Sequence, residues 1–131
     1  MRCLVDGART ARGLPSFGAA AGLDRAATRK SADILRCGEF THEACGREFS
    51  YWIRRFGHFG AGCSGIAENI AWGTGSFATP RAIFRAWMRS PGHRRNILGS
   101  YGLVGIGMRV GALEGRSGAH VWTQEFAGRD C

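Results

Sequence analysis

The stretches of this sequence that decide its fold are AENIAWG at residues 67–73, AWMRSPGHRRNIL at residues 86–98 and FTH at residues 40–42. Together they supply one carboxylate, Glu68, and two imidazoles, His42 and His93, on short polar segments between apolar runs. Carboxylate and imidazole groups are frequent metal ligands and proton carriers. The three residues are therefore the candidate functional site.

Length and charge indicate one domain with a basic surface. The 131 residues are enough for one hydrophobic core, so we expect a single domain over residues 1–131. The net charge is +8, and Lys30 is the only lysine among 18 basic residues. Arginine suits an anionic wall polymer or lipid, but the arginines are spread along the chain, and solvated helix faces explain them more simply. Because zinc-finger spacings and RNA-binding motifs are absent from the sequence, we expect no nucleic-acid partner.

Five cysteines without a CxxC pair favour disulfides and an oxidising compartment. We expect a bridge between Cys3 and Cys131, which would close nearly the whole chain into a loop. A second bridge between Cys37 and Cys45 would fix the segment that carries His42, and a bridge between Cys45 and Cys63 is the alternative. One thiol is then free or pairs between molecules.

The N-terminal segment MRCLVDGART has too short an apolar run for a signal peptide, and the sequence holds no run long enough to span a bilayer. If the protein is secreted, as its cysteines indicate, the chain is expected to be a trimmed domain; the alternative is a cytosolic protein with unusual cysteine usage.

Apolar periodicity predicts helices over residues 3–13, 22–36, 49–56 and 80–90, and strands over 103–110 and 120–126. Residues 57–66 are predicted to be a glycine-rich loop and residues near 111–118 a polar turn. Pro91 ends the fourth helix, so His93 lies on a new turn or short helix. Glycines alternate with apolar residues over 103–110, which predicts a strand packed closely on its glycine side. Helices followed by a C-terminal hairpin favour an α+β or layered α-β-α domain.

The ordered set FTH, AENIAWG, AWMRSPGHRRNIL, GLVGIGM and VWTQEF resembles the bacterial branch of the CAP superfamily. That superfamily includes the cysteine-rich secretory proteins, antigen 5 and the plant pathogenesis-related proteins of group 1, and its shared unit is called the SCP domain. The resemblance covers nearly the whole chain. It implies a three-layer α-β-α sandwich with a small, mainly antiparallel central sheet, secretion, and a cleft lined by two histidines and two acidic residues.

Carried over by position, the cleft residues are His42, His93 and Glu68. The second acid of the family, three residues after a helix tryptophan, falls on Ser90, so the set is reduced to three. Two imidazoles and a carboxylate can bind zinc or another divalent metal, with His42 and His93 as ligands and Glu68 nearby. Asn69 is expected to hold a neighbouring loop through its amide.

Two functions follow from this set. The first is a secreted binding module for a lipid, a wall polymer or a protein partner, with or without a divalent metal. The alternative is a metal-assisted hydrolase of peptide or cell-wall material, in which Glu68, His42 and His93 are catalytic. Ser90 as a nucleophile is a weaker hypothesis, because a serine before proline at a helix end is most often a cap or a stop.

The remaining aromatic and polar residues are interpreted mainly as structural. Trp72, Trp87 and Trp122 are expected to fill the core, with Trp52 or Trp72 as a candidate wall of a ligand groove. His58 and His120 match no cleft position. Thr123 and Gln124 are candidates to face the cleft from the last strand. The sequence does not indicate an oligomeric state.

Overall fold

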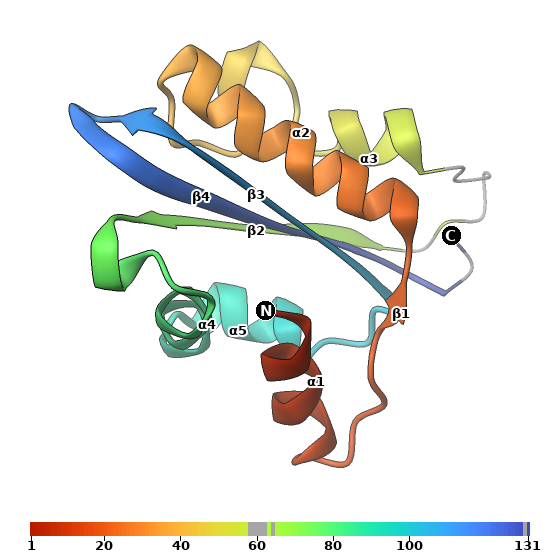
Figure 1. The fold of residues 1–131 in the computed structure, drawn as a ribbon. Coiled ribbons are helices and arrows are strands. Elements are labelled where there is room, and N and C mark those ends of the chain that lie inside the picture. The colour runs from red at the N-terminus through yellow and green to blue at the C-terminus, as the bar shows by residue number, and fades with distance from the viewer. Residues whose placement is uncertain (58–62, 64, 130) are drawn as a thin grey trace.

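The computed structural model describes residues 1–57, 63, 65–129 and 131. Its helices and strands follow one another along the chain (Figure 1). Their bounds are α1 (Arg2–Thr10), β1 (Gly18–Ala19), α2 (Ala21–Cys37), the 3-10 turn η1 (Ala44–Gly46), α3 (Tyr51–Phe56), β2 (Ile66–Gly73), the 3-10 turn η2 (Gly75–Phe77), α4 (Pro80–Arg89), α5 (Pro91–Ile97), β3 (Leu103–Leu113) and β4 (Arg116–Ala127).

The elements form three layers with the sheet in the middle. Figure 1 shows α2 and α3 over one face of the sheet and α1, α4 and α5 over the other. The strand order is β1-β3-β4-β2; β3 pairs antiparallel with β4, β4 pairs antiparallel with β2, and the two-residue β1 runs parallel to β3. The predicted α-β-α sandwich with a mainly antiparallel sheet is confirmed. In this order β2 lies at one edge of the sheet.

Helix α4 begins and ends where the sequence predicts. The Thr79 hydroxyl accepts a hydrogen bond from the Ala82 amide at 3.2 Å, and Pro80 occupies the first helical position. Ile83 and Trp87, four residues apart, are buried on the side of α4 that packs on the core. Pro91 then starts α5, which places His93 on a separate short helix as predicted.

The glycine side of β3 is packed by a helix, as the alternation predicts. A Cβ atom on Gly105 would lie 2.1 Å from the carbonyl carbon of Leu23, and one on Gly107 would lie 2.2 Å from the amide nitrogen of Thr28. Both contacts are with the backbone of α2, so no side chain fits between α2 and β3. This close packing fixes the height of α2 above the sheet.

Two features of the sheet differ from the prediction. Strand β2 is not predicted, because its apolar residues do not alternate and it carries Glu68 and Asn69 in its middle. The turn that connects the two strands of the hairpin is also shorter than predicted. Only Glu114 and Gly115 connect β3 and β4, and both have positive φ, +49° and +75°, the conformation that a two-residue hairpin turn requires.

Candidate functional site

The candidate site lies at the β2 edge of the sheet, where groups from both helical layers meet. The Glu68 side chain faces the α2 layer and contacts Lys30, while the next residue, Asn69, bonds to α5 on the opposite face. His42 comes from the loop after α2, and His93 comes from α5. The structure thus brings His42 into contact with Glu68, and the residue after Glu68 holds the backbone of His93.

A buried carboxylate orients His42. The Nδ1 atom of His42 lies 2.7 Å from Glu68 Oε1, and Lys30 Nζ lies 3.5 Å from Glu68 Oε2. The Lys30 ammonium also donates a hydrogen bond to the backbone carbonyl of His42. The side chains of Glu68 and Lys30 are each 1% exposed, whereas that of His42 is 51% exposed. His42 is therefore the member of this group that solvent and a ligand can reach.

A second acid, which the sequence analysis missed, lies beside Glu68. Glu125 on β4 is the cross-strand partner of Glu68 and is fully buried. Burial raises the pKa of Glu125 well above its usual value, and the neighbouring Glu68 charge raises it further, while Lys30 opposes the shift. Its surroundings therefore favour the protonated, neutral form of Glu125. No local sequence pattern marks Glu125, because only the strand register sets it opposite Glu68.

His93 is fixed through both its ring and its backbone. Its Nδ1 atom lies 2.8 Å from the Ser90 hydroxyl, and its carbonyl accepts a hydrogen bond from Asn69 Nδ2 at 3.1 Å. Burial lowers the pKa of His93, and the charge of nearby His42 lowers it further. The imidazole of His93 is therefore neutral at pH 7, and Ser90 serves to orient it.

An amide network joins α5 to the sheet. Asn69 Nδ2 also donates to Gln124 Oε1 at 3.1 Å, and Asn96 Nδ2 donates to Asn69 Oδ1 at 2.9 Å. Asn69 and Gln124 are fully buried. The structure thus agrees with the predicted role of Asn69, and it gives Gln124 a supporting position behind the cleft. Because these amides bond to one another and to the His93 backbone, the network holds His93 at a fixed place relative to His42.

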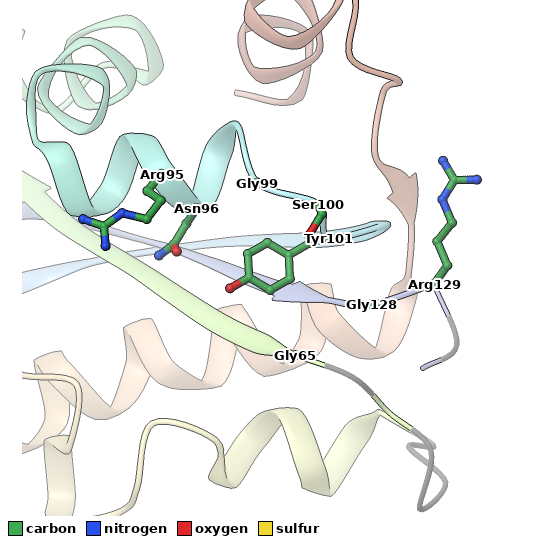
Figure 2. A pocket seen from close by; sticks show the side chains of 8 residues that line it. All are labelled: Gly65, Arg95, Asn96, Gly99, Ser100, Tyr101, Gly128 and Arg129. Atoms are coloured by element: carbon green, nitrogen blue, oxygen red, sulfur yellow. The ribbon is translucent and has the colours of Figure 1, made fainter.

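A cavity of about 550 Å³ opens beside this network. Figure 2 shows Arg95 at one end of it, Arg129 at the other and the Tyr101 ring between them. Asn96 lines the same cavity, so the amide network forms part of its wall.

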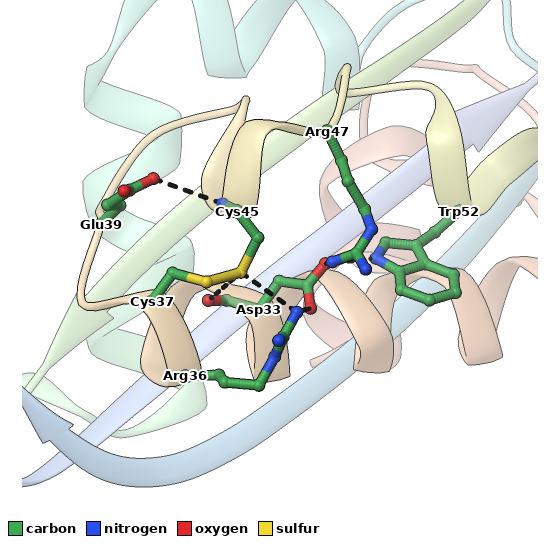
Figure 3. Close-up of a disulfide and its surroundings, with 7 residues drawn as sticks. All are labelled: Asp33, Arg36, Cys37, Glu39, Cys45, Arg47 and Trp52. Atoms are coloured by element: carbon green, nitrogen blue, oxygen red, sulfur yellow. Dashed lines mark hydrogen bonds and ion pairs between the residues drawn. A yellow bond between two sulfur atoms is a disulfide. The ribbon is translucent and has the colours of Figure 1, made fainter.

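The Cys37–Cys45 disulfide closes the loop that carries His42 (Figure 3). Buried Asp33 braces the loop from α2, because it accepts hydrogen bonds from Arg47 at 2.8 Å and from the Trp52 indole at 2.7 Å. Burial alone would raise the pKa of Asp33, but these hydrogen bonds and the one from Arg36 lower it, so the carboxylate stays charged. The predicted Cys37–Cys45 pair is confirmed.

The other disulfide differs from the prediction. Cys131 pairs with Cys63, and Cys3 is an exposed free thiol on α1. The physical reason is the layering: Cys131 packs with Leu23 and Ala26 of α2, whereas α1 lies on the opposite face of the sheet. The predicted Cys3–Cys131 bridge is wrong, and so is the Cys45–Cys63 alternative.

The remaining predicted residues serve the framework. Trp87 is buried, and its indole donates to the Ile70 carbonyl at 3.2 Å. Trp72 and Trp122 are half-buried and pack against the two sides of the sheet. Thr123 is buried and shares a hydrogen bond with Ser31 of α2. His120 is a residue of β4, as expected, and His58 lies outside the described residues.

The described residues do not fit a zinc site of the usual kind. A zinc site in a protein uses at least three protein ligands, and the described part of the chain holds no group of three or more His, Cys, Asp or Glu side chains that could hold a metal ion. Glu68 faces His42 and Lys30, which leaves two imidazole Nε2 atoms as donors. Binding of a divalent metal by His42 and His93 stays a prediction.

The sequence and fold comparisons identify the class of protein. The model of the cysteine-rich secretory protein family, CAP, matches residues 4–126. The chain therefore belongs to the CAP family, whose members are typically secreted, and the resemblance noted from the sequence is confirmed.

Particular relatives agree with this assignment. The uncharacterized protein YkwD of Bacillus subtilis (strain 168) is 34% identical over 126 residues, which are 96% of this chain and 45% of that protein. The chain thus spans about half the length of this relative. An outer surface protein from Borrelia burgdorferi superposes with a TM-score of 0.80 at 16% identity, covering 98% of this chain and 89% of that one. MpPR-1i superposes with a TM-score of 0.63 at 20% identity, covering 95% and 82%. Both structures support the fold alone.

In the part of the chain that the structure describes, no helix is long and apolar enough to cross a membrane.

Proposed function

We propose that this chain is an extracellular binding domain that holds a polar ligand between the imidazoles of His42 and His93. The proposal rests on one observation: the Nδ1 atom of His42 is hydrogen-bonded to Glu68, and the Nδ1 atom of His93 is hydrogen-bonded to Ser90. Both Nε2 atoms are therefore available to a ligand. The two rings come from opposite layers of the fold. Glu68, which holds His42, is buried, and so are the Asn69 and Gln124 amides behind the His93 backbone, so both rings are held in place before a ligand binds.

The burial of the acids favours binding over catalysis by a carboxylate. The Glu68 side chain is 1% exposed, and Glu125 is fully buried. A general base must reach the proton that it removes, and neither acid is accessible to a substrate water. Glu68 acts instead by holding His42.

The chemistry of the rings favours a ligand with hydroxyl and amide groups. Because Nδ1 of His42 is engaged by Glu68, its Nε2 atom is the ring nitrogen that can hydrogen-bond a ligand. Cavities near the site are lined by polar and charged residues such as Arg95 and Asn96. A lipid chain needs an apolar cavity, so among the ligands considered we favour a cell-wall polymer.

Calorimetric titration with soluble peptidoglycan fragments tests this proposal. Loss of one ligand hydrogen bond costs about 1 kcal/mol, so His42→Ala and His93→Ala are each expected to weaken binding about five- to tenfold. His120→Ala is the matched control, because His120 is a half-buried histidine of β4 outside the cleft. Unchanged affinity in both cleft variants, or equal loss in the control, would refute the proposal.

A hydrolase is the second candidate, and the His42–Glu68 contact supports it. A solvent-exposed imidazole held at Nδ1 by a buried carboxylate is the arrangement of a general base. In this candidate His42 removes the proton from water, and Glu68 stabilises the imidazolium that forms. Turnover of peptidoglycan fragments should then fall by orders of magnitude in Glu68→Gln. Turnover that is absent in the wild type, or unchanged in this variant, would exclude the candidate.

The zinc prediction has a separate test. If the two imidazoles bind zinc, zinc raises the melting temperature of the wild type, and the double variant His42→Ala/His93→Ala loses that shift. No shift in the wild type contradicts the prediction and leaves the binding proposal intact.

A further inference from the structure

The charge of this chain is distributed unevenly. Residues 69–113 contain six arginines and no aspartate or glutamate, although the whole chain has ten acidic residues. This segment includes α4 and α5, which cover one face of the sheet (Figure 1). Five of these six arginines, Arg81, Arg85, Arg89, Arg94 and Arg95, therefore lie on one helical layer without acids from the same segment.

The fold arranges these arginines in a line. Arg81, Arg85 and Arg89 follow one another at four-residue intervals on α4, about 6 Å apart along the helix axis. All three are exposed, as are Arg94 and Arg95 of α5. No ion pair engages any of these five side chains within the described part of the chain.

A groove lies at the junction of α4 and α5, at the end of this line. Its volume is about 360 Å³, its rim carries Arg89, Arg94 and Arg95, and its remaining lining is Met88, Pro91 and Leu98. Arg95 also lines the cavity beside Tyr101 that Arg129 borders at its other end (Figure 2). The groove and the cavity are thus both lined by Arg95, and together they extend the row of arginines toward the end of β4.

We propose that the arginine groove, formed by Arg89, Arg94 and Arg95 and extended by Arg81 and Arg85, binds an extracellular polymer of polyol phosphate units. Guanidinium groups bind phosphate through paired N–H donors, and regularly spaced cations suit a chain with regularly spaced phosphodiesters. The inference goes beyond the proposed function, because it requires neither imidazole.

Other polyanions fit less well. Proteins that bind single-stranded nucleic acid stack successive bases on aromatic side chains between their basic groups, whereas the described residues that line the arginine groove include no aromatic side chain. A helix that binds a membrane surface exposes its apolar face to the lipid, but Ile83 and Trp87 of α4 are buried in the core. The two disulfides also favour an oxidising, extracellular setting.

The test is a titration of the protein with poly(glycerol phosphate) at several salt concentrations, with the triple variant Arg89→Gln/Arg94→Gln/Arg95→Gln. The control is Arg25→Gln/Arg29→Gln/Arg54→Gln, which removes the same charge from exposed arginines of the opposite layer. Loss of three phosphate contacts should weaken binding about tenfold or more, and it should reduce the slope of log K against log salt by about 2. The control variant should change affinity by less than about threefold.

Three results would overturn the proposal. The first is an equal loss in the control, which would show attraction by net charge alone. The second is no binding of the wild type at low salt. The third is tighter binding of single-stranded DNA of equal phosphate number, or of phosphatidylglycerol vesicles, with the same dependence on Arg89, Arg94 and Arg95. His42→Ala, measured in parallel, separates the groove from the cleft, because it is expected to leave polymer binding unchanged.

Discussion

Lys30→Met tests whether the buried charges behind His42 act as a pair. The substitution keeps most of the side-chain volume but removes the ammonium that lies 3.5 Å from Glu68 and bonds the His42 carbonyl. Removing one partner of a buried ion pair costs about 3–5 kcal/mol, because the other charge is left without compensation. A domain of this size has a total stability of about 5–15 kcal/mol. With a urea m-value of about 2 kcal/mol per molar, the unfolding midpoint should fall by about 2 M.

A second variant makes this prediction refutable even if the first is poorly folded. Lys30→Met combined with Glu68→Gln removes the unpaired charge, so it should be more stable than Lys30→Met alone by about 2 kcal/mol or more. Urea denaturation followed by circular dichroism measures the stability of both variants. A cost below about 1 kcal/mol, or strict additivity of the two substitutions, would refute the pairing argument.

Three further predictions concern the framework of the site. The pKa of Glu125 in the folded protein is raised above its unfolded value near 4.5, so the contribution of Glu125 to stability is full below that pH and is lost as the pH rises through the folded pKa. The stability of the wild type should therefore fall relative to that of Glu125→Gln as the pH rises above about 4.5. Parallel pH profiles of the two proteins in urea unfolding would contradict a raised pKa of Glu125. Replacing both Cys37 and Cys45 by serine should lower the free energy of unfolding by about 2.5 kcal/mol for a sequence separation of 8, measured by calorimetry under oxidising conditions, with no loss expected if the bridge does not form. Gly107→Val should cost about 3 kcal/mol or more, because its Cβ would lie 2.2 Å from the backbone of α2, whereas Gly92→Ala, with open space around it, should be tolerated; equal melting temperatures would contradict the packing.

The sequence could predict those parts of the fold that have local signals. The start of α4 at Pro80 follows from a hydroxyl cap and a proline, and the break before α5 follows from Pro91. The packed side of β3 follows from its alternating glycines. The sequence also allowed the choice of His42, His93 and Glu68, because their residue types and order match the CAP family. The family model confirms that the chain belongs to this family.

Other parts depend on contacts that the sequence does not reveal. Strand β2 has polar residues buried on both of its sides, so its alternation is hidden. Glu125 gains its position only from the strand register that sets it opposite Glu68. The partner of Cys131 depends on which layer the C-terminus joins, which no local pattern encodes.

The structure explains the role of Ser90, whose hydroxyl lies 2.8 Å from His93 Nδ1. The family resemblance implies an acid at this position, whereas the structure has a serine that orients His93 and lies between Arg89 and Arg94 in sequence. A carboxylate here would place a negative charge at the arginine groove and beside the imidazole. The second acid next to Glu68 is Glu125, which is buried. The exposed surface of α4 and α5 therefore keeps its positive charge.

Ser90→Glu should accordingly weaken poly(glycerol phosphate) binding by about fivefold at low salt, since one exposed charge contributes up to about 1 kcal/mol. The loss should diminish as salt is added. Ser90→Ala is the matched control: it removes the hydroxyl bonded to His93 without adding charge, so polymer affinity should stay within about twofold of the wild type. Titration of both variants over a range of salt concentrations separates the two effects. If Ser90→Glu binds the polymer as tightly as Ser90→Ala, the groove does not recognise its ligand by charge, and the absence of acids from residues 69–113 has another physical cause.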